Sequence, residues 1–286
     1  MPPRLPRHSG DSFIPHDVKE FILSSVRYGD HAPSVADLTG SLQRKFSCPR
    51  KDARRLITAA VKERHIEYRD RFGRPVLAPS LHHPVMISPR IILAGPDTPA
   101  PPPGDHQPPL LRLHPGDAFG GGFHPTTRLC LEMIDDLVRP DRFPENGKVL
   151  DMGTGSGILA LACLRLGASG AMGVDTDLHA RREAEANRDL NGFHSVFKIQ
   201  SALTEEDRQP AWDLITANLR WPTLQEMAPV LATLTTASGA ILISGIYLDE
   251  IKKAGEELPD FYIEKKRESG RWGCMLFRKA LAAFSD

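Results

Sequence analysis

Cysteine is scarce in this chain, and its cysteines stand far apart from one another. None forms a C-x-x-C pair, so we expect no zinc cluster and no bound metal. Nothing in their spacing argues for disulfides, and the expected location is therefore a reducing cytoplasm. The four residues are Cys48, Cys130, Cys163 and Cys274.

Long apolar runs are also missing. No stretch approaches the roughly 20 apolar residues that a membrane-spanning helix needs. The N-terminus has Pro, Arg and His where a secretory signal would have an apolar core. The sequence therefore predicts a protein without a membrane partner.

The chain has no net charge, because 36 Lys and Arg balance 36 Asp and Glu. The balance is uneven, since residues 1–95 hold 16 basic and 9 acidic residues and the remainder holds 20 and 27. Residues 96–110 are rich in proline, as in a semi-rigid linker. The length of 286 residues favours two domains. We expect a basic domain at 1–95 and a second domain at 111–286.

The N-terminal part has the pattern of three helices followed by a hairpin. Apolar residues recur at helical spacing within 17–28, 35–46 and 49–64. Residues 66–77 have the composition of two short strands around a glycine-containing turn. This order resembles a winged helix, a small and mainly helical recognition domain.

Basic residues gather on the third of these helices and on the hairpin. They would suit contacts with nucleic-acid phosphates. Winged helices also bind proteins, and a solvated helix face is the simplest alternative. Nucleic acid, protein and intramolecular docking therefore all stay open as roles of this domain. The residues are Arg50, Lys51, Arg54, Arg55, Lys62, Arg64, Arg69, Arg71 and Arg74.

After residue 111, apolar strands alternate with helices as far as residue 258. Such alternation predicts the α/β class, with a parallel sheet covered by helices on both faces. The last two strands, at 262–267 and 273–278, have no helix between them. We therefore expect a final hairpin with an antiparallel edge strand. The earlier strands are expected at 148–152, 171–175, 195–200, 213–217 and 240–244.

The run VLDMGTGSG carries the most informative motif. An apolar strand ends at Asp151, and the chain turns through alternating glycines that begin with Gly153 and Gly155. Asp175 ends the next strand about 20 residues later, the offset of a ribose-binding acid in a nucleotide-binding βαβ unit. The third glycine comes one residue too early for a dinucleotide site. The pattern resembles motif I of class I S-adenosylmethionine (SAM) methyltransferases. A plain strand-to-helix turn is the alternative.

Two further segments carry candidate chemistry. Asn218 ends the fourth strand, where its amide would face the methyl region of the cofactor. Residues 117–127 place three consecutive glycines ahead of an amphipathic helix. Thr126 or Thr127 is expected to cap that helix and turn a hydroxyl toward the ligand. His124 is expected to order the loop as a hydrogen-bond donor, with general base as the alternative.

Together these motifs resemble the ribosomal-protein methyltransferases of the PrmA family. The run PGDAFGGGFHPTTRLCL at 115–131 is similar to the signature loop of that family, and the resemblance extends over residues 112–280. It implies a class I (Rossmann-like) enzyme that uses SAM to trimethylate amino groups of a ribosomal protein. The N-terminal domain of the family is a ferredoxin-like module, which residues 1–95 do not resemble. The resemblance implies cofactor contacts for Thr127, Gly153, Asp175 and Asn218.

The expectation is therefore an N-methyltransferase of protein amino groups that turns SAM into S-adenosylhomocysteine. A nucleic-acid amino methyltransferase stays open, although Leu219 and Arg220 stand where such enzymes usually have Pro-Pro. A DNA-binding regulator that only senses SAM is the alternative from another class. The expected catalytic residues are Asn218 and His124, and the expected cofactor contacts are Thr127, Asp151, Gly153, Gly155, Asp175 and Asn218.

Overall fold

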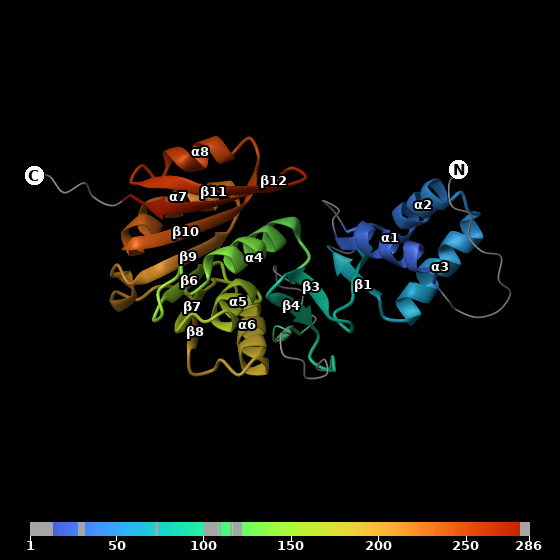
Figure 1. Ribbon diagram of the computed structural model, residues 1–286, viewed down its shortest axis with the longest axis horizontal. Helices are drawn as coiled ribbons and strands as arrows, with labels where there is room; N and C mark the ends of the chain where they lie inside the picture. Colours follow the sequence, from blue (N-terminus) through green and yellow to red (C-terminus); the bar gives the residue numbers. More distant parts are fainter. Residues whose placement is uncertain are drawn as a thin grey trace, which may run out of the picture. The chain divides into compact units, whose positions relative to one another are not determined.

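The structure is a computed structural model that describes residues 14–27, 32–71, 74–99, 108, 110–114, 116 and 122–280. Its contacts divide the chain into two units, Met1–His83 and Pro84–Asp286 (Figure 1). Each unit has a hydrophobic core of its own. Within the described ranges, no helix is long and apolar enough to cross a membrane.

The N-terminal unit has the three helices and the hairpin that the sequence predicts. Helix α1 spans His16–Arg27, α2 spans Val35–Phe46 and α3 spans Arg50–Lys62. Strands β1 (Ile66–Arg71) and β2 (Arg74–Pro79) then pair antiparallel. The elements follow one another in the predicted order, and the assignment as a winged helix stays a prediction.

Local sequence explains where α2 begins. The Ser34 hydroxyl accepts a hydrogen bond from the Asp37 amide, and the Asp37 carboxylate accepts one from the Ser34 amide. This capping box satisfies two amides that the helix leaves without partners. The apolar faces of the helices then meet the hairpin in one core that includes the fully buried Leu42, Ile57 and Leu77.

The contacts divide the units at His83 and Pro84, whereas the sequence places the boundary at residue 95. Strands β3 (Val85–Ser88), β4 (Ile91–Ala94) and β5 (Leu110–Arg112) form a small sheet within the second unit. Strand β4 pairs with β5 across the proline-rich stretch, and this pairing holds residues 85–94 in the second unit. Residues 100–107 and 109 of the expected linker lie outside the described residues.

The main sheet has seven strands in the order β11-β12-β10-β9-β6-β7-β8. Strands β8, β7, β6, β9 and β10 run parallel to one another. This confirms the predicted α/β class with a mainly parallel sheet. The strands are β6 (Lys148–Met152), β7 (Gly170–Val174), β8 (Phe197–Gln200), β9 (Trp212–Asn218), β10 (Thr235–Tyr247), β11 (Phe261–Ser269) and β12 (Trp272–Lys279).

The sequence predicts an antiparallel strand at the edge of the sheet. The structure places that strand inside the sheet. Strand β12 pairs antiparallel with both β10 and β11, so it is inserted second from the edge. Burial explains this order. Met275 and Phe277 of β12 are fully buried, whereas Tyr262 of β11 is 54% exposed. The more apolar strand therefore takes the interior position.

Helices cover both faces of this sheet (Figure 1). Helix α5 contacts both α4 and α6 on one face, and α7 and α8 lie on the opposite face. Their bounds are α4 Pro125–Leu137, α5 Ile158–Arg165, α6 Leu178–Leu190, α7 Trp221–Leu234 and α8 Ile251–Glu256.

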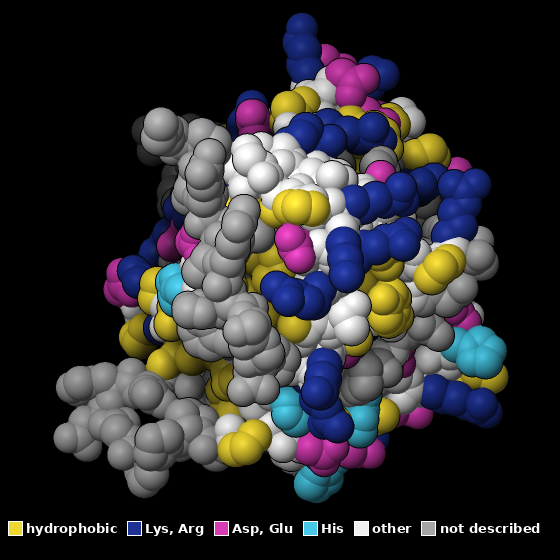
Figure 2. All heavy atoms as spheres, turned by 90° about the vertical axis from the view of Figure 1, so that its right-hand side faces the viewer, with side chains coloured by type: hydrophobic (Ala, Val, Ile, Leu, Met, Phe, Trp, Pro, Cys, Tyr) yellow, Lys and Arg dark blue, Asp and Glu magenta, His cyan; other side chains and the backbone are white. Residues whose placement is uncertain are grey.

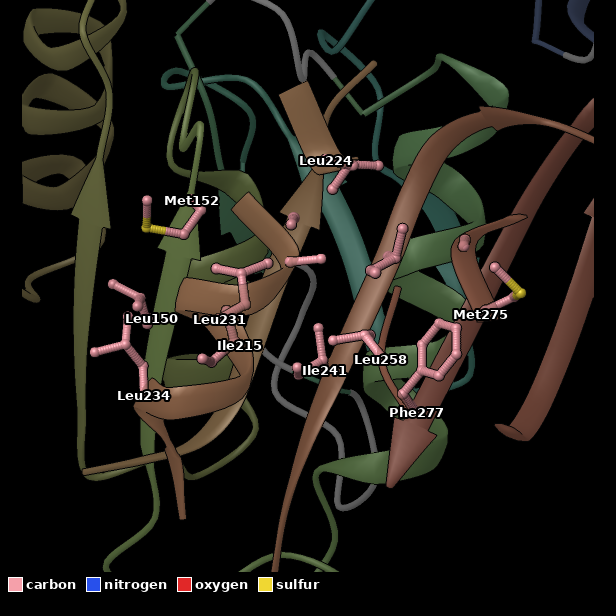
Figure 3. Packing of buried hydrophobic residues seen from close by; sticks show 14 of the residues in the cluster. Leu150, Met152, Ile215, Leu224, Leu231, Leu234, Ile241, Leu258, Met275 and Phe277 are labelled. Atoms are coloured by element: carbon pink, nitrogen blue, oxygen red, sulfur yellow. The ribbon is translucent and has the colours of Figure 1, made fainter. Parts of the chain in front are cut away.

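Successive side chains of β6 point to opposite faces of the sheet and therefore pack against different helices. Leu150 and Met152 belong to the cluster that packs under α7, together with Leu231 and Leu234 (Figure 3). Asp151 lies between them in the sequence and therefore points to the opposite face of the sheet. This places the carboxyl group under α5, beside the candidate site.

Candidate active site

The predicted site residues meet at one edge of the main sheet. Strand β6 lies between β7 and β9, and the three run parallel, so their carboxyl ends are neighbours. Asp151 is near the end of β6, Asp175 follows β7 directly, and Asn218 ends β9. Ligands of open α/β sheets bind beyond this edge.

The turn after β6 has a shape that favours glycine. Gly153 and Gly155 have φ values of +71° and +54°, in the left-handed region. A Cβ atom on Gly153 would collide with Cδ2 of Leu219. The amides of Gly153 and Thr154 donate to the Val174 carbonyl at 2.8 and 3.0 Å, which fastens the turn to the end of β7.

Asp175 joins this turn to the start of α6. Its Oδ2 accepts a hydrogen bond from the Gly155 amide at 2.9 Å, and its Oδ1 accepts one from the Asp177 amide at 3.0 Å. Asp177, not Asp175, caps α6 through the His179 amide. The half-buried Asp175 carboxylate therefore has lone pairs left for a ligand.

Asp151 is 1% exposed and lies beneath the turn. Its Oδ1 accepts from the Thr216 hydroxyl at 2.6 Å, and its Oδ2 accepts from the Thr154 hydroxyl at 2.7 Å. Burial raises the pKa of the Asp151 carboxyl to about 6, although the two hydroxyl hydrogen bonds work in the opposite direction. Both oxygens are engaged inside the protein, so Asp151 supports the turn from below.

Asn218 and Thr127 form the second half of the site. The Asn218 Nδ2 donates to Oγ1 of Thr127 at 3.3 Å, and Thr127 is fully buried. The Asn218 Oδ1 is also buried, yet it has no hydrogen-bond partner among the described residues. A buried acceptor without a partner is costly, and it points to a ligand that donates a hydrogen bond.

His124 caps α4, a role that we had expected for Thr126 or Thr127. Its Nδ1 accepts from the Thr126 amide at 3.3 Å and lies 2.7 Å from the Thr126 hydroxyl oxygen. An Nδ1 that accepts the amide N–H carries no proton, so a neutral ring has its proton on Nε2. Thr127 is thereby placed in the first turn of α4, facing Asn218.

An aromatic pair lies beside this half of the site, and the sequence does not predict the contact between its two rings. Tyr247 ends β10 and lies opposite Trp272 of β12, with ring centroids 4.6 Å apart. The Trp272 ring also meets the His124 ring edge-on at 5.1 Å. The sequence could have suggested this group only through the register of a hairpin that it left unspecified.

Asn187 is a second residue that the sequence did not single out. Its Oδ1 accepts from the His114 amide at 2.8 Å, and its Nδ2 donates to the Ser156 carbonyl at 2.9 Å. The side chain is fully buried. It connects the glycine-rich turn to the segment that leads toward the three-glycine loop. The sequence gives no signal for it, because an Asn in a helix as polar as α6 usually faces solvent.

Two glycines of the expected three-glycine loop are not described by the structure. Gly120 and Gly121 lie outside the described residues, whereas Gly122 has a φ of +85° and is tightly packed against Leu93. Within the described ranges, no group of three His, Cys, Asp or Glu side chains is placed to hold a metal ion.

The chain is similar to proteins of one family. The family model described as ribosomal protein L11 methyltransferase (PrmA) matches residues 78–280. A ribosomal protein L11 methyltransferase from Pelobacter propionicus is 36% identical over 177 residues, covering 61% of this chain and 57% of that protein. One from Geobacter sulfurreducens is 39% identical over 182 residues, covering 63% and 56%. The chain thus spans little more than half the length of these curated relatives.

A solved structure supports the same likeness. The crystal structure of ribosomal protein L11 methylase from Lactobacillus delbrueckii subsp. bulgaricus superposes with a TM-score of 0.60 at 30% identity. The superposition covers 69% of this chain and 99% of that one. The family match begins in β2, so helices α1 to α3 lie before it.

Proposed function

The chain belongs to the ribosomal protein L11 methyltransferase (PrmA) family, and on that premise we propose that its second unit is a SAM-dependent N-methyltransferase of protein amino groups. The acceptor that we propose is a ribosomal protein, because the similar proteins carry that substrate in their names. A ribosomal acceptor also favours action in the cytoplasm. S-adenosylhomocysteine is the product of this reaction.

The residues of the sheet edge fit SAM. Gly153 and Gly155 hold the turn after β6 in a left-handed conformation, and the methionine part of the cofactor would lie against the backbone of this turn. The remaining lone pairs of Asp175 suit the two ribose hydroxyls. Thr127 in the first turn of α4 and Asn218 at the end of β9 form the other half of the site. Asp151 acts indirectly in this proposal, because its carboxylate holds the turn and has no exposed oxygen to offer.

The observation that carries the proposal is the buried Oδ1 of Asn218 without a partner. Its amide is held by Thr127 through Nδ2, which leaves Oδ1 as the free acceptor. A neutral amine has N–H groups that Oδ1 can bind, and its lone pair then points away from that bond. Asn218 would therefore aim the nitrogen of the acceptor at the methyl group.

SAM supplies a methyl group on a positive sulfur, an already activated electrophile. The amine must reach it without its extra proton, because an ammonium has no lone pair. The Arg271 guanidinium lies 4.3 Å from the Tyr247 ring centroid and 5.6 Å from that of Trp272, and its positive charge disfavours an ammonium beside these rings and so favours the neutral amine. Positioning and desolvation are then the main tasks of the protein. His124 contributes by holding the start of α4, and with it Thr127.

The comparisons give no support to the two other functions that the sequence had left open. The nucleic-acid amino methyltransferase and the SAM-sensing regulator both predict that no protein would accept a methyl group. Incubating the full chain with SAM and purified ribosomal protein L11 separates these possibilities. Intact-mass spectrometry should show the acceptor gaining methyl groups.

The same assay with the Asn218→Ala variant provides the control for site-specific transfer. If SAM binds tightly and L11 gains no methyl group, the proposed acceptor is wrong. If SAM does not bind at all, the proposed enzyme class is wrong. Peptide mapping of a methylated acceptor then identifies whether the modified group is a lysine or an α-amine.

A further inference from the structure

The N-terminal unit contains a helix-turn-helix. Helices α2 and α3 are joined by the three residues from Ser47 to Pro49, and Ser47 adopts the left-handed conformation with φ 49° and ψ 40°. Pro49 then caps α3. A turn of three or four residues between two packed helices is characteristic of this motif. In DNA-binding versions, the second helix enters the major groove.

Helix α3 has one apolar face and one basic face. Ala53, Leu56, Ile57 and Ala60 are buried in the core of the unit. The outer face carries basic side chains from the first turn to the last, all of them exposed: Arg50, Lys51, Arg54, Arg55 and Lys62. A helix that only packed against its own unit would not need one sign of charge along its whole outer face.

This basic face is not neutralised from nearby. None of its five side chains forms an ion pair within the described ranges. Asp52 lies within α3, and Glu63 is its C-cap residue. Both of these acidic residues are only half-exposed. Arg44 and Lys45 in the last turn of α2 add two more exposed cations next to the turn. Figure 2 shows Lys and Arg side chains, in dark blue, gathered on the face that it presents.

We propose that the N-terminal unit binds duplex DNA, with α3 in the major groove. An α-helix with its side chains is about 10–12 Å wide, and the major groove of B-form DNA is about 12 Å wide. Four of the basic side chains lie in the first two turns of α3, the part of a recognition helix that reaches base edges. Arginine also matches the acceptor pair of guanine. The β1–β2 hairpin follows α3 directly, and its exposed Arg74 suits a phosphate contact.

The properties of this basic face favour duplex DNA over RNA and over a protein partner. The major groove of A-form RNA is too deep and narrow for a helix to read. A protein partner would need acidic surface to match this face and would usually bury apolar side chains as well. The outer face of α3 offers none, since its exposed residues besides the five cations include only Thr58. This binding goes beyond methyl transfer and does not depend on it.

The test uses the full chain and a fluorescein-labelled random-sequence DNA duplex, followed by fluorescence anisotropy. A duplex RNA of the same sequence is the competing arm. The Arg54→Ala/Arg55→Ala variant removes two exposed charges and keeps residues that favour a helix. The matched control is Lys252→Ala/Lys253→Ala, which removes two exposed charges from α8 of the other unit.

We expect the α3 variant to bind DNA at least tenfold more weakly, while the α8 variant and the wild type bind alike. Affinity should fall with salt by about 0.9 log units per log unit of salt for each phosphate neutralised. RNA binding as tight as DNA binding would overturn the proposal, as would equal losses in both variants. Salt-insensitive binding of ribosomal protein L11 through α3, with no DNA binding, would assign the face to protein instead. Unchanged thermal unfolding of the α3 variant shows that its loss is not a folding defect.

Discussion

Asn218 at the end of β9 and Thr127 in the first turn of α4 are separated by 91 residues, yet the amide nitrogen of one lies 3.3 Å from the hydroxyl oxygen of the other. This contact fixes which end of the Asn218 amide is free. Because Nδ2 is held, the carbonyl oxygen Oδ1 remains as the acceptor that we propose for a substrate amine. The orientation of one side chain thus depends on a helix that is distant in the sequence.

Replacing Asn218 with Ala should lower turnover more than it lowers affinity for SAM. The proposed task of this side chain is to orient the incoming amine, which matters most near the transition state. Steady-state rates with saturating acceptor and calorimetric SAM affinity measure the two effects separately. Thr127→Val, which frees the amide without removing it, should give a smaller loss of turnover. Normal turnover of the Asn218 variant would remove this residue from the mechanism.

Asp175→Ala should weaken SAM binding by about 1–3 kcal/mol, the cost of leaving buried hydroxyls without partners. That is roughly a 5- to 150-fold rise in Kd. The Gly155 amide also loses its partner, so the turn should become less ordered. Titration calorimetry measures the change, with Asp189→Ala on the exposed side of α6 as the control. An unchanged Kd for the Asp175 variant would contradict the ribose assignment.

Gly153→Ala should destabilise the fold and weaken SAM binding together. The left-handed conformation costs a residue with a Cβ about 1–2 kcal/mol, and that Cβ would collide with Leu219. Urea unfolding gives the free energy of unfolding for each variant. Adding Leu219→Ala should recover part of the stability, because it removes the collision and leaves the strained φ. If the second substitution recovers nothing, the contact with Leu219 does not limit this position.

Asp151 should make the free energy of unfolding depend on pH in a defined window. Its pKa is about 6 in the folded state and 3.8 in the reference state. Between these values the folded state keeps a proton that the unfolded chain has released. The free energy of unfolding therefore falls as pH rises through the window, by up to about 1.4 kcal/mol per pH unit from this group.

The variant Asp151→Asn should lose that part of the pH dependence. Its side chain is neutral at every pH and still offers an oxygen to one threonine hydroxyl. Urea unfolding of both proteins between about pH 4 and pH 6 measures the two slopes. Parallel curves for the wild type and the variant would show that Asp151 does not titrate in this range.

The position of a truncation should decide whether the second unit folds. A chain that starts at Pro84 keeps β3 and β4 and should bind SAM with nearly wild-type affinity. A chain that starts at Gly104 loses Arg90, which forms an ion pair with Asp135 of α4 at 2.6 Å. The nearly buried Asp135 would then lack its partner, a loss of about 3–5 kcal/mol. Circular dichroism and calorimetry on the two chains test this, and equal stability would refute the role of β3 and β4.

Local patterns in the sequence determined the elements and half of the site. The capping pair Ser34 and Asp37 marks the start of α2, and the glycines after β6 mark a turn that only a small residue can make. Asp175 follows from its offset to that turn. These signals are local because capping, turn conformation and alternation each depend on a few neighbouring residues.

Tertiary structure alone decided the rest. The pairing of β4 with β5 moved the boundary between the units, and the greater burial of β12 placed it between β10 and β11. The contacts of Asn218 with Thr127 and of Tyr247 with Trp272 follow from the packing of α4 and the register of β12. Such contacts join segments far apart in the chain. Their partners depend on which arrangement of the whole sheet buries the most apolar surface, and no local pattern encodes that choice.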